Sequence, residues 1–304
     1  MSVLMSDLLY TMLSKQLHAI DAAHCNLMRD ALESGQVIFC PHYAFLPVAD
    51  ERDLLSLTQS DLTQKNISYY HIKNHVLGIS STSRHRSSLQ GMMRRYALFA
   101  RQLVDTLFPY YNHALVWGRT SYRPAEIANR SVSKRQDDTR LHVDAFPATP
   151  VNGSRILRVF CNINPHEQAR VWHLGESFSQ VLTHFKHQLP AYSGFRANLL
   201  KQLRLTKTLR TPYDHFMLNL HDSMKLDDMY QAHVSKQRVE FPAHSTWIVF
   251  SDQVSHAALT GQFLLEQTFY LPVDAMACSE HSPYHQLIAH GVLQPRTHQM
   301  GLAS

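Results

Sequence analysis

Short strand-type runs fill the chain from about residue 113 onward, and they limit the folds that it can adopt. The clearest runs cover residues 114–117, 155–163, 246–250 and 263–271, and Pro, Gly, Asn and Asp separate them. Short apolar runs bounded by turn residues are typical of strands. Strands at these intervals predict a double-stranded β-helix, which is the jelly-roll or cupin-like arrangement of two sheets.

Helical periodicity marks the rest of the chain. Apolar residues recur at helical spacing from Leu8 to Leu32, before Gly35, and again over about 88–107; a short strand is predicted at 36–40. A helical insert over about 176–233 interrupts the strand-rich part. We therefore expect one α+β domain over residues 1–304. Its parts are a helical support layer (about 1–112), a jelly-roll core with the helical insert (about 113–275) and a C-terminal tail (276–304).

Composition and charge exclude several classes of protein. With 44% hydrophobic and 17% charged residues among 304, the chain is expected to be globular. Its four cysteines form no close pairs, so neither a disulfide framework nor a zinc ribbon is predicted. No signal peptide or membrane-spanning run is recognisable, and we expect a cytoplasmic protein. A net charge of +5 favours an anionic partner, namely a phosphorylated or carboxylated substrate, an acidic membrane face or nucleic acid.

The residues His142 and Asp144 lie two positions apart in an extended segment, so both side chains are expected on one face of it. His256 follows another strand-type run and precedes small residues. Together the three form a candidate 2-His-1-carboxylate site for non-haem Fe(II). The chain has 21 histidines, so a core or surface histidine is the alternative interpretation of His256.

Iron sites of this kind commonly use 2-oxoglutarate, whose far carboxylate needs a cation from the protein. Alternation along the strand at 155–163 places Arg158, Phe160 and Asn162 on one face. Arg158 is therefore the candidate clamp, and a structural ion pair with Glu266 is the alternative. Asn162 and Gln267 are candidates to assist in binding the co-substrate.

Four segments of the sequence resemble the bacterial family of 3-deoxy-D-manno-oct-2-ulosonic acid (Kdo) hydroxylases. They are residues 121–127, 137–147, 155–160 and 247–270, within a similarity that runs from about Leu32 to Pro283. The resemblance implies an Fe(II)- and 2-oxoglutarate-dependent dioxygenase that uses O2. It implies hydroxylation of C3 of a Kdo residue in Kdo–lipid A, which gives the sugar Ko, and it implies iron binding by His142, Asp144 and His256.

One feature departs from the wider dioxygenase pattern. An arginine commonly follows the second histidine by about ten residues, but residues 262–267 here are Gln-Phe-Leu-Leu-Glu-Gln. The clamp must therefore come from elsewhere, which favours Arg158.

The expected substrate is anionic, and basic residues precede the metal segment closely. Candidates to line the entrance are Arg119, Arg123, Arg130, Lys134, Arg135 and Arg140. Tyr122 and Trp172 are candidates to stack on a sugar face, with core packing as the alternative. Because the implied substrate is a membrane lipid, we expect peripheral docking on the cytoplasmic face of the anionic inner membrane. The predicted docking element is an N-terminal helix that carries Val3, Leu4, Leu8, Leu9, Met12 and Leu13.

Other functions fit parts of the pattern. A cupin-type isomerase or a metal-dependent hydrolase acting on an anionic sugar would use the same three ligands. A protein that only binds anionic glycans or membrane surfaces would retain the barrel without the metal. Nucleic-acid binding is not expected, because no reader motif is recognisable.

Overall fold

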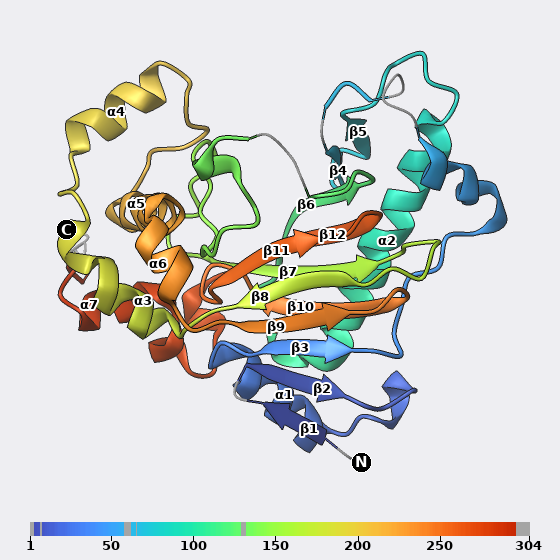
Figure 1. The fold of residues 1–304 in the computed structure, drawn as a ribbon, viewed down its shortest axis with the longest axis horizontal. Coiled ribbons are helices and arrows are strands. Elements are labelled where there is room, and N and C mark those ends of the chain that lie inside the picture. Colours follow the sequence, from blue (N-terminus) through green and yellow to red (C-terminus); the bar gives the residue numbers. More distant parts are fainter. Residues whose placement is uncertain (1–2, 7, 58–61, 65, 129–131, 296–304) are drawn as a thin grey trace, which may run out of the picture.

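The computed structural model describes residues 3–6, 8–57, 62–64, 66–128 and 132–295 (Figure 1). Its largest element is a mixed sheet in the order β1-β2-β3-β10-β7-β12-β6-β4-β5, in which β2 and β3 pair in parallel and the other neighbours are antiparallel. The strands are β1 (Val3–Ser6), β2 (Leu9–Met12), β3 (Val37–Cys40), β4 (Ile67–Tyr70), β5 (His75–Leu77), β6 (Val116–Arg123), β7 (Arg155–Asn162), β10 (Ser245–Phe250) and β12 (Leu264–Leu271).

A second, three-stranded sheet has the order β11-β8-β9. Its strands are β8 (Arg170–Leu174), β9 (Gln237–Phe241) and β11 (His256–Thr260). The two sheets share a core in which Phe160 and Trp247 of the large sheet pack with Trp172 and Phe241 of the small one. Because strand side chains alternate, β7 turns Arg158 and Phe160 toward this space between the sheets.

Two helices, α1 (Ala22–Glu33) and α2 (Arg86–Leu107), cover the other face of the large sheet. The alternate residues of β7, Leu157, Val159 and Cys161, pack there in the largest hydrophobic cluster. The α2 helix buries one apolar stripe that includes Met92, Tyr96 and Leu103, which is the pattern expected for a helix on a sheet.

The remaining helices gather at one end of the sheets (Figure 1). They are α3 (Phe178–Phe185), α4 (Gly194–Gln202), α5 (Pro212–Leu226), α6 (Asp228–His233) and α7 (Pro283–Ala289). Leu141 and Val143 pack in the cluster formed by α3, α5 and α7. These two apolar residues anchor one face of their extended segment in the helices, which leaves His142 and Asp144 for the opposite face.

The predicted strands at 36–40, 155–163, 246–250 and 263–271 match β3, β7, β10 and β12, and the predicted helix at about 88–107 matches α2, but the N-terminal prediction was wrong. Residues 8–32 do not form one helical region, because β2 pairs in parallel with β3, with Leu9 opposite Val37. The support layer at 1–112 therefore contains strands β1 to β5 as well as helices. The first strand-type run also begins later than predicted, since β6 starts at Val116 and continues to Arg123.

The predicted N-terminal docking helix is absent for the same reason. Met12 is fully buried, and Leu8 and Leu9 pack against the core between the sheets. The side chains of Val3 and Leu4 lie outside the described part of the structure. Among the described residues, no helix has both the length and the apolar character needed to cross a bilayer.

Candidate metal centre and its cavity

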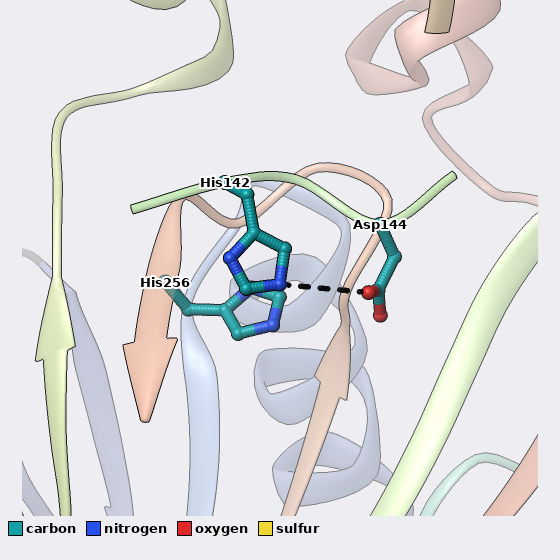
Figure 2. A group of neighbouring side chains, drawn as sticks. All are labelled: His142, Asp144 and His256. Atoms are coloured by element: carbon teal, nitrogen blue, oxygen red, sulfur yellow. Dashed lines mark ion pairs between the residues drawn. The ribbon is translucent and has the colours of Figure 1, made fainter. Parts of the chain in front are cut away.

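The segment that carries His142 and Asp144 lies beside the start of β11, which carries His256 (Figure 2). Backbone hydrogen bonds join the two histidines reciprocally: His142 N–H donates to His256 O at 3.0 Å, and His256 N–H donates to His142 O at 2.9 Å. The Asp144 N–H donates to Ser251 O at 2.8 Å. The candidate ligand atoms of the three side chains all lie within 4.8 Å of one another. The structure thus brings together residues that are 112 positions apart.

The hydrogen bonds of the imidazoles fit a metal site. His142 Nδ1 lies 2.8 Å from Arg140 O, and His256 Nδ1 lies 2.8 Å from Val254 O. A carbonyl only accepts, so each Nδ1 carries the proton and each Nε2 keeps its lone pair for a metal. With one carboxylate, this donor set suits Fe(II) and leaves coordination positions open.

The electrostatic environment favours the metal-binding forms of all three residues. Burial, together with His256 and Lys225, holds the pKa of His142 well below its ordinary value, and burial also lowers the pKa of His256. Burial opposes ionisation of Asp144, but Arg158, His256 and a hydrogen bond from Ser251 together outweigh it, so the pKa of Asp144 is lowered. The histidines are therefore neutral and the carboxylate is charged near neutral pH, as metal binding requires.

Arg158 lies between two carboxylates. Its Nη2 is 3.0 Å from Oδ2 of Asp144, and its Nη1 is 3.3 Å from Oε1 of Glu266. Arg123 also contacts Glu266, at 2.5 Å. Burial alone would raise the pKa of Glu266, but Arg123, Arg158 and Arg119 together outweigh it and lower the pKa. The ion pair between Arg158 and Glu266 that was the alternative interpretation is therefore present, while the clamp role of Arg158 stays a prediction.

A cavity of about 460 Å³, here called the metal cavity, opens around these residues. Its charged lining is mostly positive, and the carboxylates in it are Asp138 and Asp144. Such a lining favours an anionic ligand. The cations that line it are Arg119, Arg123, Arg135, Arg158, Arg170 and Lys225.

Three residues predicted to bind ligands do not line the metal cavity. Asn162 donates to the carbonyls of Gln168 and Phe241 at the far end of β7. Gln267 accepts from Thr120 and so points to the other face of β12 from Glu266. Tyr122 lies in the core beneath α2, where its hydroxyl donates to Leu54 O. Strand alternation turns Gln267 and Tyr122 away from the metal, and the amide of Asn162 is engaged by two carbonyls, so the structure does not support the predicted ligand-binding role of any of the three.

The other predicted substrate-binding residues differ in whether they line the metal cavity. Arg123 and Trp172 line the cavity, but Trp172 is 2% exposed and stacks on His256, with ring centroids 5.0 Å apart. Arg140 lies outside the cavity lining, where it bonds Lys225 O and Asp228. Of the other basic candidates, Arg119 and Arg135 line the cavity, Lys134 instead pairs with Asp228, and Arg130 is outside the described residues.

Sequence reasoning missed three cavity residues. His221 and Lys225 lie four positions apart on α5, so one face of the helix presents both to the cavity. Lys225 is only 2% exposed, and a lysine within a buried apolar face was the available signal. Arg170 comes from β8, a strand whose single arginine lies among apolar residues.

A family model for 3-deoxy-D-manno-oct-2-ulosonic acid (Kdo) hydroxylases matches residues 16–291. The chain belongs to the Kdo hydroxylase family. This membership does not favour the isomerase, the hydrolase or the purely binding protein that the sequence alone left open.

Solved Kdo hydroxylases have the same fold. The chain is 41% identical to the Kdo hydroxylase KdoO, a non-haem Fe(II) α-ketoglutarate-dependent dioxygenase, in complex with cobalt(II); the TM-score is 0.90 over 94% of this chain and 96% of that one. The complex of KdoO with α-ketoglutarate and Fe(III) is 41% identical, with a TM-score of 0.88 over 93% and 95%. The complex with succinate and Fe(III) is 40% identical, with a TM-score of 0.89 over 94% and 96%. The comparison with curated proteins gave no match.

Proposed function

We propose that this chain is an Fe(II)- and 2-oxoglutarate-dependent dioxygenase that hydroxylates C3 of a Kdo residue in Kdo–lipid A to give Ko. The observation that carries the proposal is the trio His142, Asp144 and His256, with both Nε2 atoms free for a metal, at the wall of a cation-lined cavity. Family membership and the α-ketoglutarate and succinate complexes of KdoO support the same reaction class.

The proposed architecture behind this activity is a double-stranded β-helix formed by the two sheets. The positions of two site residues support this architecture. His256 begins a strand of the small sheet, whereas Arg158 comes from the large sheet. Ligands and cation thus approach the metal cavity from opposite sheets.

Each side chain has a distinct task in the proposed reaction. His142, Asp144 and His256 hold the iron. With iron held there, O2 would be the oxidant and 2-oxoglutarate would supply two of the electrons: one oxygen atom would enter succinate, formed with CO2, and the other would enter the new hydroxyl group on C3. Arg158 is proposed to bind the far carboxylate of 2-oxoglutarate, because its guanidinium is 8% exposed and can share its donors with a third carboxylate. The surrounding cations orient the anionic sugar, so that a single carbon reaches the oxidant.

The direct test is release of labelled CO2 from 2-oxoglutarate by the purified protein. Release should require Fe(II) and rise when a Kdo-containing glycolipid is added, and mass spectrometry should find one added oxygen atom on Kdo. Absence of succinate under all of these conditions would falsify the dioxygenase proposal.

Membrane docking is proposed through a segment other than the N-terminus. Residues 194–210, here called the α4 segment, contain α4 and the loop that follows it. The exposed apolar side chains of this segment are Phe195 (79%), Leu199 (43%), Leu203 (59%), Leu205 (59%) and Leu209 (37%). The exposed cations Arg196, Lys201, Arg204 and Lys207 alternate with them, and the segment contains no acidic residue. Apolar and basic side chains on one segment suit the cytoplasmic surface of an anionic membrane.

Vesicle sedimentation tests this docking surface. The wild-type protein should bind vesicles that contain phosphatidylglycerol and bind pure phosphatidylcholine more weakly. Phe195→Ser should weaken binding to the anionic vesicles severalfold, since it removes an apolar contact with the bilayer. The matched control is Ile72→Ser, because Ile72 is also 79% exposed but lies in the turn between β4 and β5. Equal losses for the two variants would count against the α4 segment.

A further inference from the structure

A second cavity, here called the neighbouring cavity, adjoins the metal cavity. It has a volume of about 330 Å³, which lies within the usual size of small-molecule sites. Both cavities include Arg119, Phe146 and Pro147 in their walls. The Phe146 ring also lies 5.5 Å from the guanidinium carbon of Arg158 and so forms a partition between the two spaces. Arg119, Phe146 and Pro147 therefore lie at the border between the two cavities.

One wall of the neighbouring cavity is aromatic. Tyr70 and Tyr270 come from β4 and β12, the two strands that flank β6 in the large sheet. The ring of Trp117 in β6 packs instead on the helical face of the sheet, where it contacts His71 (centroids 4.0 Å apart), Phe269 (5.2 Å) and the guanidinium of Arg101 in α2. Rigid aromatic side chains offer an apolar surface with polar edges, which suits the C–H face and hydroxyl rim of a sugar ring.

Two cations that border this aromatic wall make no side-chain hydrogen bond or close ion pair with the described residues, although the charge of Arg119 also acts on Glu266. Neither Arg119 nor Lys207 makes a hydrogen bond or ion pair through its side chain with any residue that the structure describes, whereas Arg123 and Arg158 of the metal cavity are paired. The backbone around Lys207 is fixed, because its N–H donates to Ala148 O at 3.0 Å. Unpaired cations beside an aromatic wall indicate a ligand that is both cyclic and anionic.

We infer that the neighbouring cavity is a subsite for the anionic sugar unit next to the one that is hydroxylated. The inference rests on the proposed function, because the metal cavity must hold the first sugar. The anion is a carboxylate or a phosphate on the second sugar, and it contacts Arg119 and Lys207 while the ring lies against Tyr70 and Tyr270. The enzyme thereby recognises two linked units and not an isolated monosaccharide.

The test compares two water-soluble substrates, so that membrane binding plays no part. One is the deacylated glycan with its acidic sugars and phosphates, and the other is the methyl glycoside of Kdo. For Lys207→Glu, the ratio of the KM for the glycan to the KM for the glycoside should rise about tenfold, since a charge pair is replaced by repulsion. The matched control is Lys15→Glu, which reverses an exposed charge that lines neither cavity and should leave the ratio unchanged.

Two further glycans show whether the anion bound at Lys207 is a phosphate or a carboxylate. If the Lys207→Glu effect vanishes with a dephosphorylated glycan, the ligand is phosphate; if it vanishes with a glycan that has a single acidic sugar, the ligand is carboxylate. Either result supports the subsite, and a ratio within twofold of wild type with the complete glycan overturns it.

If the proposed function itself is wrong, the wild-type protein will turn over neither substrate. In that case, calorimetric titration of the deacylated glycan decides the question. Weaker binding to the Lys207→Glu protein than to wild type supports the subsite, and equal binding overturns it.

Discussion

The guanidinium of Arg158 lies 3.0 Å from Oδ2 of Asp144, the carboxylate of the candidate iron site. The same guanidinium contacts Glu266, which is itself held by Arg123. A chain of four alternating charges therefore runs from β6 through β12 and β7 to the metal segment. This chain fixes the direction of the Asp144 carboxylate before a metal binds, because Arg158 cannot move toward the metal without losing Glu266.

Replacing Arg158 should loosen the iron site. We expect Arg158→Met to weaken Fe(II) binding and to raise the KM for 2-oxoglutarate, each about 10- to 100-fold, which is the usual cost of removing a group that orients a metal ligand. Arg238→Met is the control, since Arg238 pairs with Glu240 in an exposed position on β9. Metal titration and steady-state kinetics measure both effects, and unchanged metal affinity in Arg158→Met would contradict the orienting role.

Removing a ligand should abolish iron binding without unfolding the protein. His142→Ala deletes one imidazole, but the backbone bonds between residues 142 and 256 do not involve that side chain. We expect loss of stoichiometric Fe(II) binding with a melting temperature close to that of wild-type apoprotein. Elemental analysis and calorimetry check this result. His75→Ala, at an exposed position on β5, should retain the metal.

A buried ion pair outside the cavity should dominate local stability. Arg155 Nε lies 2.8 Å from Oδ2 of Asp252, and both side chains are 1% exposed or less. Asp252→Ala leaves a buried guanidinium without its carboxylate, which costs about 3–5 kcal/mol of unfolding free energy. Asp30→Ala removes the exposed partner of Arg29 and should cost about 1 kcal/mol or less. Denaturant unfolding gives both values, and similar costs for the two variants would refute the difference.

Thiol reactivity should separate the four cysteines. Burial raises the pKa of Cys40 to about 12 and that of Cys161 to about 11, so almost no thiolate forms at pH 8. Cys25 is also buried, whereas Cys278 is partly exposed. Mass spectrometry after alkylation of the folded protein at pH 8 should find label on Cys278 first, and denatured protein should take up four labels. Early labelling of Cys40 or Cys161 would be incompatible with this core.

Local patterns predicted the metal residues and the central strands well. His142 and Asp144 share a face because their segment is extended, and β7, β10 and β12 are rich in apolar residues and buried along almost their whole length. The partners of strands were not predictable in the same way. The parallel pairing of β2 with β3 depends on contacts between distant residues, and apolar spacing alone favoured a helix there.

The roles of polar strand residues depended on the strand register, which decides the face of the sheet that each side chain occupies. Alternation correctly turned Arg158 inward, but the same rule, applied to β6 and β12, places Tyr122 and Gln267 on the helical side. The register of β12 opposite β7, and that of β6 opposite β12, were needed to decide this. Lys225 and His221 were missed, because the approach of α5 to the cavity is a tertiary relationship that no local pattern encodes.

The reciprocal hydrogen bonds between the backbones of His142 and His256 have a consequence for the enzyme in a cell that is short of iron. Peptide groups, and not the metal, hold these two histidines side by side. We therefore expect protein made during iron scarcity to fold with both histidines already in position. Such protein would need only to take up the metal, and no new synthesis of the chain, when iron returns.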